Sequence, residues 1–153
     1  MRNNPLITLA ILLIAAILGV IGYKFAPLLQ PQAELTLPAS ACTPGIRPCT
    51  ATLPDGSRLE LLIDPLPLRP LSPLKLTVTI DGGKAERVAI DFEGTQMKMG
   101  LNRPQLVGGD GRFSGQTTLP VCITGSMEWT ATVLLSSGKQ TLAIPFNFDV
   151  AGR

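Results

Sequence analysis

The residues best suited to chemistry in this sequence carry sulfur, and four of them fall within thirty-one positions: Met97, Met99, Cys122 and Met127. No other methionine follows residue 1, and the sequence contains no histidine. Thioether and thiolate ligands are soft and favour Cu(I) over hard cations. The pattern therefore predicts a Cu(I) site in which these four side chains are the ligands.

The spacing of these residues gives them ways to meet. Met97 and Met99 are separated by one residue, so on an extended segment both thioethers point to the same side. Cys122 stands five residues before Met127, and the turn-forming triplet 124–126 between them could fold the two sulfurs toward each other. Trp129 could cap the site by placing its π face over the cation.

Packing is the alternative interpretation of the same residues. Methionine and unpaired cysteine are common in protein cores. Met127 also falls on the same alternating face as Trp129 and Ala131, where it would point inward. Cys122 could be buried and inert or retained for chemistry, and the residues alone leave both possibilities open.

Other classes of function are disfavoured by composition. Without histidine, a Gly-x-Ser-x-Gly elbow or a phosphate-binding glycine loop, the sequence does not suggest an enzyme, and we expect no small-molecule substrate. The formal net charge is only +2, and lysine and arginine do not form a cluster. A nucleic-acid partner is therefore not expected.

The N-terminus carries an apolar run, Leu6–Tyr23, in which Thr8 is the only clearly polar residue. A run of this length can just span a bilayer, so residues 1–29 are predicted to be a transmembrane signal anchor. A cleavable signal peptide is the rival, but the small residues 39–41 lie too far beyond the run for ordinary processing. Arg2 on one side against Lys24 on the other favours a cytoplasmic N-terminus and an exported body. We therefore expect a single span in the inner membrane, with the C-terminal domain in the periplasm.

Prolines punctuate residues 30–56, which are predicted to be a semi-extended stalk. This segment contains Cys42 and Cys49, separated by six residues around a Pro-Gly pair. In an exported protein a disulfide is their expected fate. A second pair of metal ligands is the alternative, although this spacing differs from that of common metal knuckles.

Residues 57–153 alternate apolar and polar side chains almost throughout, which predicts half-buried strands. The positions on the alternating face of the expected strands are Leu59, Leu61 and Ile63; Leu74, Leu76, Val78 and Ile80; Val88, Ile90 and Phe92; Phe113, Gly115, Thr117 and Leu119; Met127, Trp129, Ala131, Val133 and Leu135; and Leu142, Ile144, Phe146, Phe148 and Val150. Glycine-rich turns separate these runs, and no helical periodicity follows residue 30. The expected fold is all-β, an immunoglobulin-like antiparallel sandwich preceded by one transmembrane helix.

Four motifs carry a family resemblance: Met97-Lys-Met-Gly-Leu-Asn-Arg-Pro, Gly111-Arg-Phe-Ser-Gly, Leu119-Pro-Val-Cys and Met127-Glu-Trp-Thr-Ala-Thr-Val. They resemble small membrane-anchored proteins of proteobacteria whose layout is similar to that of the FixH and YtkA-like group. The resemblance covers residues 42–150 loosely and 97–133 more closely. It implies an immunoglobulin-like periplasmic domain and a role in copper delivery or in assembly of a haem-copper respiratory oxidase. The sequence departs from that group in having no histidine and few methionines. A non-metal module that docks onto a membrane complex is the competing interpretation.

Overall fold

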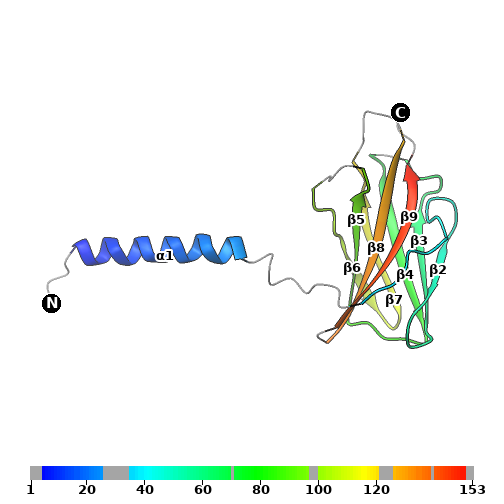
Figure 1. Ribbon diagram of the computed structural model, residues 1–153, viewed down its shortest axis with the longest axis horizontal. Coiled ribbons are helices and arrows are strands. Elements are labelled where there is room, and N and C mark those ends of the chain that lie inside the picture. The colour runs from blue at the N-terminus through cyan, green and yellow to red at the C-terminus, as the bar shows by residue number, and fades with distance from the viewer. Residues whose placement is uncertain are drawn as a thin grey trace. The chain divides into compact units, whose positions relative to one another are not determined.

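The computed structural model describes residues 5–25, 35–69, 71–96, 100–120, 126–138 and 140–150. The chain divides into two compact units, 1–32 and 33–153. The second unit is mostly β, and the elements within the described residues are one helix and nine strands (Figure 1). The strands are β1 (Leu35–Thr36), β2 (Cys49–Thr52), β3 (Arg58–Asp64), β4 (Pro73–Asp81), β5 (Arg87–Gly94), β6 (Gln105–Gly109), β7 (Arg112–Thr118), β8 (Met127–Ser137) and β9 (Gln140–Val150).

Helix α1 spans Pro5–Phe25. Proline suits its first position, where a backbone N–H would have no partner within the helix. The large apolar side chains described on it, between Leu9 and Val20, are exposed, including the four consecutive residues 11–14, which point in different directions around the axis. Within the part of the chain that the structure describes, no helix is long and apolar enough to cross a membrane.

The nine strands form one curled sheet in the order β1-β9-β8-β5-β6-β7-β4-β3-β2. Strand β6 joins two halves, because its first residues pair with β5 (Val88 with Leu106) and its last with β7 (Gly109 with Arg112). The β5–β8–β9 half lies in front of the β3–β4–β7 half in Figure 1. The halves share one hydrophobic core. The pairing is antiparallel except between β1 and β9, which are parallel, so the expectation of a purely antiparallel arrangement is wrong at this edge.

Period-two burial confirms the strands predicted from alternation. On β3 the buried residues are Leu59, Leu61 and Ile63, and on β4 they are Leu74, Leu76, Val78 and Ile80, with Thr77 also buried. Strand β8 buries every second residue from Met127 to Leu135. The side chains that alternate with them face outward and are exposed or half-buried.

The segment 35–56 differs from the expected stalk. It contributes two strands, β1 and β2, and buries Cys49 and Leu53 in the core. Its prolines flank β2 at Pro48 and Pro54 and do not interrupt it. Proline density indicated an extended chain, but the segment pairs with the sheet, so the packed unit begins upstream of residue 57.

Candidate functional site

One end of the sheet gathers the sequence segments that surround the sulfur residues, and we name it the sulfur end. Here β5 ends at Gly94, β8 begins at Met127 and β9 ends at Val150. Gly94 pairs with Trp129, and Met127 pairs with Val150. These ladders bring the loop that follows β5 and the loop that precedes β8 to the same end of the sheet.

Met127 lies in the core. Its side chain is 4% exposed and belongs to the hydrophobic core cluster of the β domain. Its inward direction follows from its phase on β8, where it alternates with the exposed Glu128. The structure therefore gives Met127 a packing role, and any ligand role would require a cation to approach from within the protein.

Trp129 is 1% exposed and lies in the same cluster. Two aromatic neighbours in this cluster, Phe92 and Phe148, meet edge to face with ring centroids 6.4 Å apart. A cation over the indole face would be surrounded by apolar side chains, where an unpaired charge is costly. The geometry of Trp129 is that of a core residue.

Met97, Met99 and Cys122 lie outside the described residues. The described residues that flank them are held to one another across the sulfur end. The backbone N–H of Thr95 donates to the Glu128 carbonyl at 3.1 Å, and the Thr95 hydroxyl donates to the Glu128 carboxylate at 3.1 Å. Thr95 precedes Met97 by two residues, and Glu128 follows Met127, so both segments are fixed on their flanks to the same point of the sheet.

A second set of bonds fixes the last part of the β5–β6 loop, where the chain approaches β6. Arg103 forms an ion pair with Asp91 at 2.5 Å, and the Asp91 side chain is mostly buried. Asn102 accepts a hydrogen bond from the Thr117 hydroxyl and donates to the Thr118 carbonyl. Backbone bonds from β5 to Asn102 and Pro104 complete the attachment. The loop after Met99 is therefore attached to both halves of the sheet.

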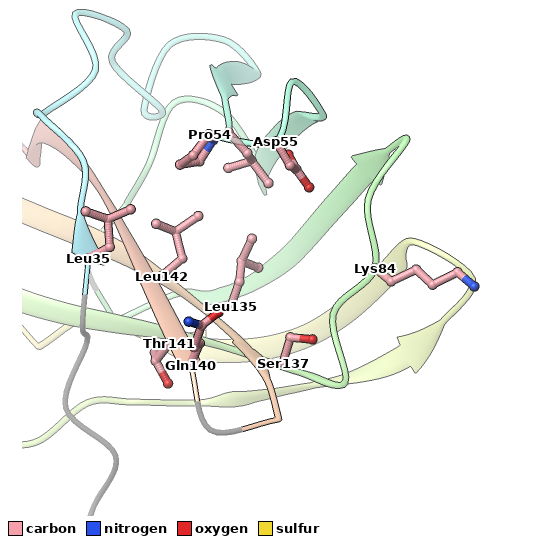
Figure 2. A pocket seen from close by; sticks show the side chains of 10 residues that line it. Leu35, Pro54, Asp55, Lys84, Leu135, Ser137, Gln140, Thr141 and Leu142 are labelled. Atoms are coloured by element: carbon pink, nitrogen blue, oxygen red, sulfur yellow. The ribbon is translucent and has the colours of Figure 1, made fainter.

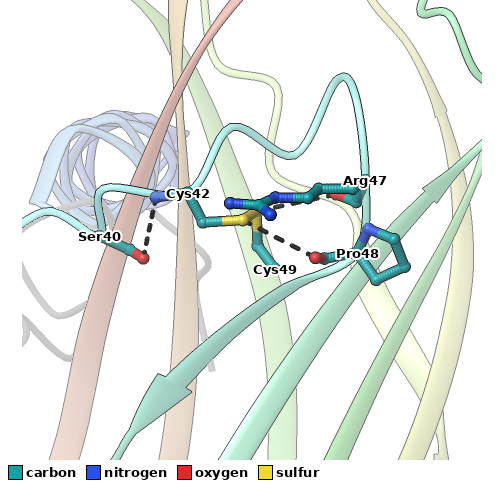
Figure 3. Close-up of a disulfide and its surroundings, with 5 residues drawn as sticks. All are labelled: Ser40, Cys42, Arg47, Pro48 and Cys49. Carbon is teal, nitrogen blue, oxygen red and sulfur yellow. Dashed lines mark hydrogen bonds between the residues drawn. A yellow bond between two sulfur atoms is a disulfide. The ribbon is translucent and has the colours of Figure 1, made fainter.

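The disulfide between Cys42 and Cys49 confirms the prediction from their spacing (Figure 3). Their Cα atoms are 5.6 Å apart. The sulfur atoms also approach the carbonyl oxygens of Pro48 and Arg47 at 3.7 Å. These are contacts only, because a bridged cysteine has no S–H to donate. Since neither sulfur is a thiolate, the alternative interpretation of this pair as metal ligands is wrong for the oxidised protein.

Exposed apolar side chains mark the loops of the sulfur end. Ile46 is 75% exposed, Leu71 68% and Leu101 75%. The backbone N–H of Leu71 donates to the Leu119 carbonyl, which ties its loop to the chain that leads toward Cys122. The sequence alone does not reveal these residues, because an apolar side chain in a loop carries no sign of its own exposure, which depends on the fold.

The opposite end contains a groove of about 310 Å³ (Figure 2). Leu35, Leu135 and Leu142 point into it beneath Pro54, while the Lys84 side chain extends away from them. Asp55 lies at its rim. The pKa of this carboxyl is lowered from its usual value of 3.8, first by a hydrogen bond from the Ser57 hydroxyl and then by one from the Ser57 backbone N–H. The groove contains no sulfur ligand among its lining residues.

No group of three or more histidine, cysteine, aspartate or glutamate side chains that could hold a metal occurs among the described residues. Comparisons with protein-family models, with curated proteins and with solved structures found no significant match.

Proposed function

We propose that this chain is a membrane-anchored periplasmic protein that binds Cu(I) at the sulfur end of its β domain through Met97, Met99, Cys122 and Met127. The observation that supports this most is the pairing of Gly94 with Trp129. It joins the end of β5 to the start of β8, and the four sulfur residues lie on the chain immediately beyond these two points. Residues that lie up to thirty positions apart in the sequence are thus attached to the sheet at neighbouring points.

Covalent geometry limits how far the sulfur residues can lie from the described chain. Two residues of fully extended backbone reach about 7 Å. Met97 follows Thr95 by two residues, Met99 precedes Gly100 by one, and Cys122 follows Pro120 by two. In this proposal, these short connections keep the three residues near the sulfur end. The proposal requires that their side chains meet at one shared Cu(I).

The ligand chemistry suits Cu(I) better than other metals. The chain has no histidine, which disfavours ordinary zinc and Cu(II) sites. Cys122 would dominate binding because its thiolate is charged and the thioethers are neutral. Binding would displace the thiol proton, so the affinity for Cu(I) should rise with pH.

The curled sheet is of the immunoglobulin type in this proposal. The strand order β3-β4-β7-β6 matches the four-strand sheet of that fold, and β5-β8-β9 matches its three-strand sheet. The chain crosses from one half to the other between β4 and β5, returns between β5 and β6, and crosses again between β7 and β8, in the manner of that fold. Such a sandwich supports many functions, so the sulfur residues must carry the assignment.

The anchor belongs to the same proposal. A helix with exposed apolar side chains in every direction needs a cover of lipid or protein, because water does not solvate such a surface favourably. The length of the run Leu6–Tyr23 favours lipid. Fractionation of cells followed by immunoblotting tests this: full-length protein in the inner membrane supports the anchor, and a shortened soluble form contradicts it.

The coordination chemistry can be tested by X-ray absorption at the copper edge. The full-length chain in detergent would be loaded with one equivalent of Cu(I), kept reduced by ascorbate, which spares the disulfide better than a dithiol does. We expect a coordination shell made of sulfur alone. A shell dominated by nitrogen or oxygen would contradict the proposed ligands.

Delivery of copper to a haem-copper respiratory oxidase follows from the family resemblance and is the cellular part of the proposal. Loss of the chain should lower oxidase activity, and wild type should restore it where Cys122→Ser does not. Equal restoration of oxidase activity by wild type and by Cys122→Ser would contradict a cellular role that depends on copper binding by Cys122.

A second function is favoured by the exposed apolar side chains Ile46, Leu71 and Leu101. They suit a module that docks on a membrane protein complex while Met127 and Trp129 serve only as core. Replacing Leu71 and Leu101 by Ser distinguishes the two accounts. The docking account predicts loss of oxidase activity with copper affinity unchanged, whereas loss of activity only in sulfur variants favours copper.

A further inference from the structure

The two free edges of the sheet are formed by strands that follow each other in the sequence. In the strand order, β1 is at one end and β2 is at the other. Residues 37–48 connect them, so this one segment runs from the edge of the β5–β8–β9 half to the edge of the β3–β4–β7 half. It contains most of the loop closed by the Cys42–Cys49 disulfide.

Contacts along this segment reach both halves. Ser40 donates its backbone N–H to the Pro145 carbonyl on β9. Gly45 packs so closely that an added Cβ would come within 3.2 Å of Leu68, which follows β3, and within 3.8 Å of the Asp149 carbonyl on β9. Cys49 then enters the core at 0% exposure and pairs with Leu61. The disulfide loop therefore lies across the gap between the two sheet edges.

Apart from this connection, few contacts hold strand β2 on the sheet. It has four residues and, among the strands that the structure describes, pairs with β3 alone. Thr50 and Thr52 are exposed, so its contribution to the core comes mainly from Cys49 and the adjoining Leu53. Short edge strands of this kind open locally at low cost.

We propose that the Cys42–Cys49 disulfide is a redox-sensitive clasp that keeps β2 on the sheet, and that its reduction releases β2 and uncovers the edge of β3 while the rest of the sheet stays folded. The reductant is a dithiol. One of its thiolates attacks Cys42, the half-buried partner, and Cys49 leaves as a thiolate that takes up a proton. The second thiol of the reductant then closes its own disulfide and releases Cys42. Two electrons and two protons pass to the protein. This inference uses only described residues and does not depend on copper binding.

The size of the effect follows from loop closure. The crosslink joins residues 7 positions apart in the sequence. Closing so short a loop lowers the population of the open form of β2 by roughly 60-fold. Reduction should raise the open population of β2 by up to that factor. Strands β4, β7 and β8, which are paired on both sides, should not change.

Hydrogen exchange on the full-length chain in detergent, before and after treatment with a dithiol, tests the clasp. Peptide mapping of alkylated thiols would verify reduction at Cys42 and Cys49. We expect the amides of β2, and those amides of β3 that bond to β2, to exchange at least tenfold faster after reduction, with β8 and β9 unchanged. Unchanged exchange of these β2 and β3 amides would overturn the proposal. Loss of protection throughout β8 and β9 would overturn it as well, because the disulfide would then hold the whole fold.

A double variant gives an independent measurement. Cys42→Ser with Cys49→Ala should show the same faster exchange of these β2 and β3 amides without any reductant. The matched control is Thr50→Ala, which alters β2 at an exposed position and leaves the crosslink in place. Equal exchange in the control and the double variant would overturn the role of the disulfide. If the double variant fails to fold, the reduced wild type decides the question.

Discussion

Two substitutions at Met127 separate packing from ligation. Leucine keeps most of the side-chain volume and removes the thioether, whereas alanine removes both. Met127 is 4% exposed within the core, so Met127→Ala deletes buried contacts and leaves a cavity. Changes of this kind cost about 2–5 kcal/mol. Because Met127 begins β8 and pairs with Val150 at the end of β9, its neighbours can move into the space. We therefore expect Met127→Ala to lower the free energy of unfolding by about 2–3 kcal/mol.

Met127→Leu should cost less than about 1.5 kcal/mol in the free energy of unfolding. If Met127 is a ligand, the leucine variant should still bind Cu(I) more weakly than wild type does. Urea unfolding followed by the fluorescence of Trp129, the single tryptophan, measures stability. Chelator competition measures affinity on the same samples.

The outcomes are distinct. An unchanged urea midpoint for Met127→Ala would refute the assignment of Met127 to the core. Wild-type Cu(I) affinity in Met127→Leu would remove Met127 from the ligand set and leave three sulfur ligands.

Two further predictions concern the fold. Gly108→Ala should lower the free energy of unfolding by about 1–3 kcal/mol, because the added Cβ would overlap the Arg112 carbonyl and lie 2.8 Å from the Phe113 Cα. The adjacent Gly109→Ala, which meets nothing within 4 Å, is the matched control for thermal melts, and equal melting of the two variants would contradict the close approach of β6 and β7. Ser57→Ala should raise the pKa of Asp55 toward 3.8, which NMR titration can follow, because it removes the largest cause of the lowered value. A carboxyl whose pKa is lower in the folded state than in the unfolded state stabilises the fold at pH values above its unfolded pKa, and this stabilisation is lost as the pH falls through its folded pKa. The difference in free energy of unfolding between wild type and Ser57→Ala should therefore shrink in acid. A difference that stays constant with pH would contradict this role of Asp55.

Strand positions with clear alternation could be predicted from the sequence. The burial of Leu59, Leu61 and Ile63 follows directly from a two-residue period. Strands β1, β2 and β6 were not predicted. Strand β2 pairs locally with β3, but the prolines around it indicated a stalk, whereas β1 pairs with a distant part of the chain. Leu35 pairs with Leu142, more than a hundred residues away, and nothing in two residues of sequence signals that contact. On β6, Gly108 and Gly109 suggested a turn, yet both belong to the strand and the turn begins at Asp110.

The candidate site was only partly predictable for a related reason. The Cys42–Cys49 disulfide could be inferred because its spacing and export context are local properties. Met127 fitted the pattern of a ligand and that of a core residue equally well. Its burial establishes that it packs in the core, but does not test whether it binds a metal. The exposure of Ile46, Leu71 and Leu101, which lie on three different loops, needed the tertiary fold.

The most direct test of copper binding is an anaerobic Cu(I) titration of the full-length chain against a competing chelator, with ascorbate as reductant. We expect one Cu(I) per wild-type chain, an affinity that rises with pH, and a greater loss for Cys122→Ser than for any single methionine replaced by leucine. The double replacement of Met97 and Met99 should cause an intermediate loss. Equal affinity in wild type and Cys122→Ser, or no binding in competition with the chelator, would contradict the proposed site.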